Sequence, residues 1–89
     1  MRLDKFLKVS RLIKRRTLAK EVCAGGGVEV NRRPAKASTE VKPGDVLTLK
    51  IGNHWQTVEI LATPEHIAAD QARDTYRLLA EGKTEGESG

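Results

Sequence analysis

Lysine and arginine dominate the first 36 residues, which contain eleven of these cations and only three acidic side chains. The net charge of this segment is +8, whereas that of residues 37–89 is −4. An ammonium group binds phosphate as a point charge, and a guanidinium group binds it through two parallel hydrogen bonds. A solvated charged surface is the alternative interpretation. The segregation of charge favours a polyanion that faces residues 1–36.

Residue types that support catalysis are scarce. A covalent mechanism needs a nucleophile with a base and an orienting group, and zinc needs ligands at regular spacing. The two histidines, His54 and His66, and the single cysteine, Cys23, provide neither arrangement. We therefore predict no catalytic residue, no metal site, no cofactor and no enzymatic activity. Cys23 is predicted to be a small core residue, and Trp55 to cover one end of the core rather than to stack on a base.

The length of 89 residues indicates one small domain. No apolar run approaches the roughly 18 residues that a membrane span needs, and the N-terminus lacks the apolar core of a signal peptide. These features predict a cytoplasmic protein that has no membrane partner.

Two helices are expected to position the cations. Leu3, Phe6 and Leu7 form one apolar stripe over residues 2–9, which leaves the neighbouring cations on another face. A second helix is predicted over residues 15–24, with Leu18, Ala19, Val22 and Cys23 on its inner side. The glycines at 25–27 then end this helix, because one of the first two can adopt a positive φ without a Cβ penalty. A phosphate-binding loop is disfavoured, because such loops precede a helix.

A sheet is expected to follow. Alternation predicts strands over 28–30, 46–51 and 56–61, with turns at 31–34, 41–45 and 52–53. The turn at 31–34 presents Arg32 and Arg33 at an exposed tip, and we expect them on the same face as the arginines at the start of the second helix. Thr63-Pro64-Glu65 has the features of a helix start, which predicts a helix from 63 to about 80. Residues 81–89 are predicted to be a disordered tail.

Three ordered fragments resemble the S4-like RNA-binding domain family. They are Arg2-Leu3-Asp4-Lys5-Phe6-Leu7, then Arg15-Arg16-Thr17-Leu18-Ala19, then Gly26-x-Val28-x-Val30-Asn31, and the resemblance covers about residues 1–50. Many members have Asn-Gly where this chain has Asn31-Arg32. This departure is expected to change the turn type and to add a cation.

The resemblance implies an α+β fold in which two short N-terminal helices pack on a small bent antiparallel sheet. The expected units are the S4-like domain over 1–62, the C-terminal helix over 63–80, packed on or beside it, and the tail over 81–89. The RNA-binding residues implied by the family are Arg2, Lys5, Arg15, Arg16, Thr17, Lys20, Asn31 and Arg32, with Asp4 orienting an arginine. The charge pattern adds Lys8, Arg11 and Arg33.

The opening 22 residues and Ala35–Asp45 are most similar to free-standing bacterial members of this family that act in ribosome quality control. That similarity implies binding to the obstructed large (50S) ribosomal subunit with its peptidyl-tRNA, through contacts with 23S rRNA and tRNA. It also implies support of template-free alanine tailing of the stalled chain, beside a tailing factor on the same subunit. Off the ribosome we expect a monomer.

Three alternatives remain open at this point. One is a heat-shock-type S4 protein that recycles 50S subunits with stalled tRNA, although the acidic C-terminal half argues against it. Another is the RNA-binding module of an enzyme whose catalytic chain is separate. The last is a protein-interaction module whose basic face does not act on RNA.

Overall fold

Two short helices begin the chain, as the sequence predicts. The computed structural model describes residues 1–83, in which α1 spans Leu3–Val9 and α2 spans Arg16–Ala24. Leu3, Phe6 and Leu7 are fully buried, so the apolar stripe of α1 faces the core. Helix α2 packs against α1 and buries Ala19 and Cys23. Cys23 is therefore a core residue, as predicted, whereas Leu18 is 45% exposed and its expected place on the inner side is wrong.

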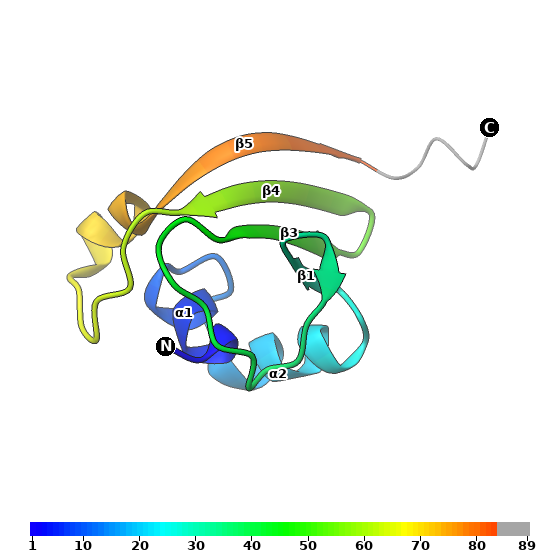
Figure 1. Ribbon diagram of the computed structural model, residues 1–89, viewed down its shortest axis with the longest axis horizontal. Helices are drawn as coiled ribbons and strands as arrows, with labels where there is room; N and C mark the ends of the chain where they lie inside the picture. Colours follow the sequence, from blue (N-terminus) through cyan, green and yellow to red (C-terminus); the bar gives the residue numbers. More distant parts are fainter. Residues whose placement is uncertain (84–89) are drawn as a thin grey trace.

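Five strands form one antiparallel sheet in the order β2-β1-β3-β4-β5. Their bounds are Val28–Val30 for β1, Arg33–Pro34 for β2, Val46–Ile51 for β3, His54–Ile60 for β4 and Tyr76–Lys83 for β5. Both helices lie on one side of the curved sheet (Figure 1). The family's arrangement of two helices on a small sheet is thus present.

The two faces of the sheet differ because side chains alternate along each strand. Leu47, Leu49, Val58 and Ile60 point toward the helices and are almost completely buried. We call this the inner face. Thr48 and its cross-strand partner Thr57 point the other way, with their hydroxyl oxygens 3.3 Å apart. We call that side the outer face.

The three glycines turn the chain from α2 into β1. Gly26 adopts a φ of 79°, so the second of the two candidate glycines supplies the positive φ. The Gly27 N–H donates to the Val22 carbonyl (2.9 Å), and the Gly27 carbonyl accepts from the Lys50 N–H (2.7 Å). A Cβ on Gly27 would lie 2.8 Å from the Lys50 carbonyl oxygen and 2.8 Å from Val22 Cγ1. The third glycine is therefore required by close approach of the backbones.

The predicted helix over 63–80 is wrong in its extent. Residues 61–68 have no regular structure, a 3₁₀ helix (η1) spans only Ala69–Thr75, and β5 follows directly. The Thr75 carbonyl accepts the Leu61 N–H (2.8 Å) instead of a helical N–H, and this contact ends η1 beside the end of β4. The open edge of β4 then pairs with β5 along its length. Backbone pairing at this edge outweighs the helical pattern of the sequence.

The C-terminal residues require a second correction. Glu81, Gly82 and Lys83 are the last residues of β5, so the expected disordered tail does not begin at 81. The remaining part of that prediction, residues 84–89, lies outside the described residues. Trp55 is half-buried and lies across from Gly82, where an added Cβ would come within 3.0 Å of the indole ring. The indole therefore covers the glycine backbone of the neighbouring strand.

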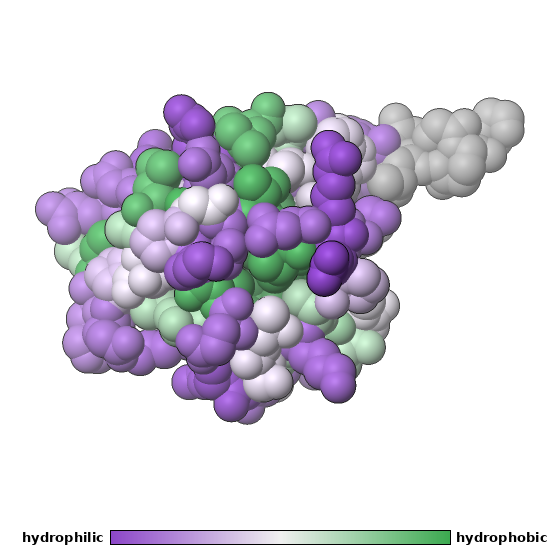
Figure 2. Space-filling model, viewed as in Figure 1, coloured by the Kyte–Doolittle hydropathy of each residue, from purple (hydrophilic) through white to green (hydrophobic). Residues whose placement is uncertain are grey.

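The surface is mostly hydrophilic, with a hydrophobic area over β5 at the upper edge of the view (Figure 2). Leu78 and Leu79 of this strand are about half exposed. Across residues 1–83, no helix is long and apolar enough to cross a membrane. The same residues contain no His, Cys, Asp and Glu cluster that could hold a metal ion.

Candidate nucleic-acid interface

Asp4 lies among the cations of α1, α2 and their N-caps. We call the surface that these cations form the helix-side surface. The Asp4 carboxylate is fully buried, and it accepts from Arg2 Nε at 3.2 Å and pairs with Arg16 Nε at 3.3 Å. Both arginines remain nearly half exposed, with side-chain exposures of 47% and 43%. The buried carboxylate thus holds the guanidinium groups of Arg2, at the start of α1, and Arg16, at the start of α2, at the surface. We call these three residues the Asp4 cluster. That Asp4 orients these arginines for RNA binding stays a prediction.

The electrostatics of Asp4 favour its ionised form. Burial raises the pKa of the carboxyl, but the hydrogen bonds and charges of Arg2 and Arg16 together outweigh burial and hold the pKa below its ordinary value. Asp4 is therefore a carboxylate at neutral pH. Because each arginine keeps unused N–H donors outside this contact, both can also donate to a phosphate.

Residues 37–41 fix the start of α1. The N–H groups of Leu3 and Asp4 donate to the carbonyls of Thr39 (2.8 Å) and Ala37 (3.1 Å). These are backbone donors that a helix start leaves without helical partners. Arg2 also forms an isolated bridge with Glu40. The segment after β2 therefore determines where the first arginine lies.

The connection between the helices is anchored by small and apolar residues. Ser10 ends α1, and its hydroxyl donates to the Leu7 carbonyl at 3.2 Å. Ile13 is buried. Arg11 adopts a φ of 62°, a conformation that glycine usually supplies after a helix. Arg15, the N-cap residue of α2, is extended and exposed.

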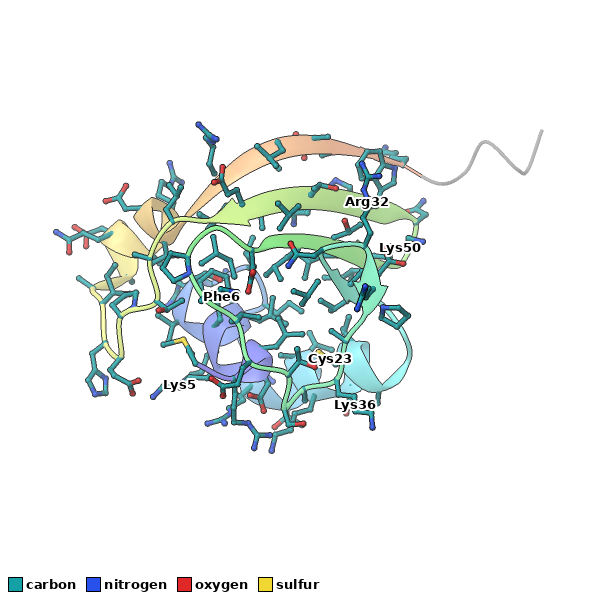
Figure 3. All side chains as sticks on the ribbon, in the orientation of Figure 1. Lys5, Phe6, Cys23, Arg32, Lys36 and Lys50 are labelled. Carbon is teal, nitrogen blue, oxygen red and sulfur yellow. The ribbon has the colours of Figure 1, made fainter. Side chains whose placement is uncertain are left out.

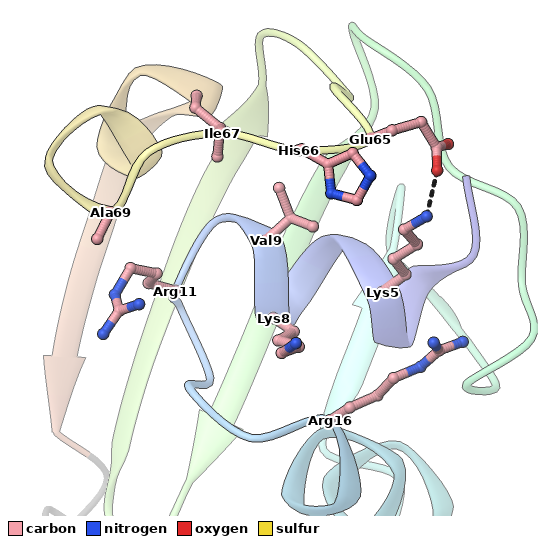
Figure 4. Close-up of a pocket in the computed structure, with 9 residues that line it drawn as sticks. All are labelled: Lys5, Lys8, Val9, Arg11, Arg16, Glu65, His66, Ile67 and Ala69. Carbon is pink, nitrogen blue, oxygen red and sulfur yellow. Dashed lines mark hydrogen bonds and ion pairs between the residues drawn. The ribbon is translucent and has the colours of Figure 1, made fainter.

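A hollow of about 410 Å³ opens between α1 and the segment before η1 (Figure 4). We call it the α1 hollow. It brings four predicted RNA-binding cations together on one side, and it is lined by Lys5, Lys8, Val9, Arg11 and Arg16 there and by Glu65, His66, Ile67 and Ala69 on the other side. Lys5 Nζ donates to Glu65 Oε1. This hydrogen bond and the Lys5 charge hold the Glu65 pKa below its ordinary value.

The remaining predicted residues of α2 are simple surface groups. Arg15, Thr17 and Lys20 are exposed. Within residues 1–83, neither Arg15 nor Lys20 has an acidic side chain within ion-pair distance. These cations extend the helix-side surface beyond the Asp4 cluster.

The turn after β1 keeps the geometry of an Asn-Gly turn. Asn31 and Arg32 have φ values of 53° and 69°, which is the two-residue pattern of a type I′ hairpin. The expected change of turn type therefore does not occur. Arg32 therefore occupies the second turn position, where a positive φ is free of steric cost for glycine but not for a residue with a Cβ.

The side chain of Asn31 is committed to the fold. Its amide donates to Asp45 Oδ1 (3.2 Å), and its carbonyl oxygen accepts the Val46 N–H (3.0 Å). Burial raises the Asp45 pKa, but hydrogen bonds from Asn31 and Lys42 with the Lys42 charge bring it below the ordinary value. Asn31 thus fixes the turn to β3, which local sequence could not indicate because Asp45 is 14 residues away.

Arg32 and Arg33 lie on different faces of the sheet. Arg32 lines a shallow surface with Thr48, Thr57 and Leu79 on the outer face. Figure 3 shows it on the opposite side of the sheet from Lys5. Arg33 pairs with Val30, whose side chain packs on the core, so Arg33 belongs to the inner face. The expectation that both arginines share one face with the helical cations is wrong for Arg32.

The far side of the α1 hollow is formed by residues that the sequence does not place near α1. The predicted helix start at Thr63-Pro64-Glu65 does not form, and Glu65 and His66 lie in the irregular segment 61–68. No local pattern reveals a contact between residues 60 positions apart.

The amino-acid sequence is similar to those of several bacterial proteins of known name. It is 52% identical over 83 residues to the "RQC P-site tRNA stabilizing factor" of Bacillus subtilis (strain 168), and the match covers 93% of this chain and 96% of that protein. It is 39% identical over 82 residues to heat shock protein 15 of Escherichia coli (strain K12), covering 91% of this chain and 62% of the relative.

The fold is also similar to that of a heat shock protein 15, in agreement with the sequence similarity. Heat shock protein 15 of Vibrio cholerae, described as trimeric, has a TM-score of 0.82 and 36% identity, covering 90% of this chain and 82% of the other. The family model of the S4 domain matches residues 1–47, which include α1, α2, β1, β2 and the start of β3. With more than half of its residues in that match, the chain belongs to the S4 domain family.

Proposed function

We propose that this protein binds the obstructed large ribosomal subunit and stabilises the tRNA that remains on it. The observation that supports this most directly is the Asp4 cluster, in which one buried carboxylate holds Arg2 and Arg16 at the surface of an S4 domain. The name of the Bacillus subtilis relative, which refers to P-site tRNA stabilisation in ribosome quality control, supports the same role.

The helix-side surface is proposed to contact 23S rRNA. Structured RNA is recognised largely by shape, through phosphates and 2′-hydroxyls. Arg2, Arg16 and Arg15 present guanidinium donors on a rigid pair of helices, which suits that mode of recognition. Arg32, on the outer face, is proposed to contact the tRNA. An RNA on each side of the sheet would place the protein between the two.

The proposed activity is positional and involves no bond chemistry on this chain. A protein that holds peptidyl-tRNA between elongation steps would support template-free alanine tailing by a separate factor on the same subunit. The location that follows from this role is the cytoplasm. Neither a metal nor a cofactor is needed for it.

Sedimentation of the tagged protein from cells tests the proposal. We expect the wild type to comigrate with 50S particles that contain tRNA, and Arg16→Ala to remain at the top of the gradient. Arg77→Ala is the matched control, because Arg77 is an exposed arginine on β5 paired with Glu59. Circular dichroism should show that both variants keep the wild-type fold. Comigration of Arg16→Ala at the wild-type level would contradict the proposal.

A second function is favoured by one observation. The TM-score of 0.82 to heat shock protein 15 favours the heat-shock-type alternative, for which we propose recycling of 50S subunits without alanine tailing. Deletion of the gene distinguishes the two. Loss of C-terminal alanine tails on stalled chains would favour the quality-control role, whereas intact tails with accumulated tRNA-bound 50S particles would favour recycling.

A further inference from the structure

The α1 hollow has two chemically different walls. Lys8 of α1, Arg11 of the connection and Arg16 of α2 place cations on one side. Ile67 and Ala69, before and at the start of η1, contribute apolar surface on the other side. Its volume of about 410 Å³ lies within the roughly 300–1,000 Å³ of small-molecule sites. The apolar wall lies outside residues 1–47, so the match to the S4 domain does not include it.

This combination suits a nucleotide that has left its helix. A flat base needs an apolar or aromatic wall, and His66 and Ile67 provide one beside Val9 (Figure 4). The attached phosphate needs cations, which Lys8 and Arg11 provide at the opposite rim. A paired duplex could offer its phosphates and 2′-hydroxyls to the hollow but no unstacked base, because its bases are stacked inside the helix.

The backbone at Arg11 gives separate support. A φ of 62° is strained for any residue with a side chain, and glycine would end α1 without this strain. An arginine at this position puts a guanidinium group at the rim of the hollow. Strained residues of this kind concentrate at binding sites.

Glu65 and Lys5 form the polar end of the hollow. The Glu65 carboxylate is an acceptor only, and the Lys5 ammonium is a donor only, and the two groups are hydrogen-bonded side by side. Guanine has the complementary edge, with N1–H and N2–H₂ donors next to the O6 acceptor. Adenine would direct its N1 acceptor at the carboxylate. Uracil and cytosine each offer one donor at most to the same group in this pose.

We propose that the α1 hollow binds one unstacked guanosine of an RNA. Glu65 accepts from the N1–H and N2–H₂ groups, Lys5 donates to O6, and Lys8 and Arg11 bind the phosphate. Arg16 belongs both to the hollow and to the Asp4 cluster, so the site continues the RNA surface of the proposed function. The inference rests on that function and adds base specificity to it.

Fluorescence anisotropy with short RNA hairpins tests the site in the full-length protein. Four hairpins differ in one unpaired nucleotide, and a fifth is fully paired. We expect the hairpin with unpaired G to bind roughly tenfold more tightly than those with A, C or U, since a bidentate base contact discriminates at about this level. Equal affinity for the four unpaired hairpins would overturn the inference.

Variants connect the preference to the hollow. Glu65→Gln is expected to bring the affinities for G and the other bases within about twofold of one another, because its amide presents a donor to N1–H. Glu40→Gln is the matched control: Glu40 is an exposed acid paired with the N-terminal ammonium, outside the hollow. It should keep the wild-type preference. A preference for G that survives Glu65→Gln would overturn the assignment.

Two further arms separate the outcomes. Arg2→Ala should weaken binding to all hairpins alike, so loss of RNA binding by this variant supports the proposed function whether or not G is preferred. Guanosine monophosphate that competes only at concentrations far above the hairpin's Kd supports an RNA guanosine. Guanosine monophosphate that binds as tightly as the hairpin would overturn the RNA source.

Discussion

Asp4 shows how one buried residue combines stability with function. Its carboxylate is removed from water, and its partners are two arginines that remain nearly half exposed. Hydrogen bonds to charged groups contribute about 1.5–3 kcal/mol each to the free energy of unfolding. The arginines are thus oriented by an interaction that also links the start of α1 to the start of α2.

Asp4→Asn should lower the free energy of unfolding by about 1–3 kcal/mol at pH 7. The folded pKa of Asp4 is below the ordinary value of 3.8, so the carboxylate's contribution is complete above that value and is lost as the pH falls through the folded pKa. Urea unfolding should therefore show a difference between wild type and variant that shrinks below about pH 4.

The control for Asp4 is Asp70→Asn, at an exposed residue of η1. It should leave the unfolding free energy within about 0.5 kcal/mol of wild type. Asp45 also has a lowered pKa and remains in the Asp4 variant, so some acid sensitivity persists. A difference between wild type and Asp4→Asn that stays constant from pH 7 to pH 3 would contradict the role of the ionised carboxylate.

Arg32 occupies a backbone conformation that favours glycine. Its φ is 69°, and glycine there is expected to stabilise the fold by about 1 kcal/mol by removing the Cβ clash. For a chain of this size Arg32→Gly should raise Tm by about 4–8 °C. Arg33→Gly is the control, because Arg33 lies in β2 and its φ is not positive. An unchanged or lower Tm for Arg32→Gly would show that the turn is not strained.

At the scale of elements, the joint between α2 and β1 depends on one close approach. Gly27→Ala would put a Cβ 2.8 Å from the Lys50 carbonyl oxygen and from Val22 Cγ1, so α2 and β3 would have to separate. We expect a loss of about 1–3 kcal/mol in unfolding free energy, as for other overpacked sites. Thermal denaturation followed by circular dichroism measures it.

Gly25→Ala is the matched control for this joint. Its φ is −82°, and an added Cβ would be 3.5 Å from its nearest neighbour, the Glu21 carbonyl oxygen. Its unfolding free energy should stay within about 0.5 kcal/mol of wild type. Equal losses in the two alanine variants would contradict the backbone contact at Gly27.

The same elements show which parts of the fold local sequence determines. The stripe of Leu3, Phe6 and Leu7 and the alternation in β3 each need only neighbours in the chain, and both predictions are confirmed. Residues 63–80 differ, because both a helical stripe and strand alternation can be found in them. Pairing with the edge of β4 decides between the two, and that edge is distant in sequence.

In the candidate site, too, some features are determined by local sequence and others by long-range contacts. Asp4 and Arg16 belong to sequence fragments that resemble the S4-like RNA-binding domain family, so their place in the candidate site could be inferred from sequence. The exposure of Arg32 on the outer face depends on the register of the β1–β2 turn. The contact between Lys5 and Glu65 joins residues that are 60 positions apart in the chain. Long-range geometry of this kind leaves no local pattern.

For the molecule as a whole, the distribution of cations over two faces predicts how binding depends on salt. Seven predicted cations lie on the two helices, their N-caps and the connection between them, namely Arg2, Lys5, Lys8, Arg11, Arg15, Arg16 and Lys20. Arg33 lies on the inner face of the sheet, whereas Arg32 lies on the outer face. If six to eight cations contact phosphates, log K should fall with log salt at a slope of roughly −4 to −7. A hairpin that binds the helices cannot also contact Arg32.

Salt titrations of two variants therefore separate the faces. Arg15→Ala should make the slope for a short RNA hairpin shallower by about 0.7–0.9, since one phosphate contact is lost. Arg32→Gly should leave that slope unchanged, although it removes the same charge from the molecule. A steep change for Arg32→Gly would mean that the hairpin spans both faces or binds the outer one. Because total charge falls equally in the two variants, any difference between them measures the position of the charge and not its amount.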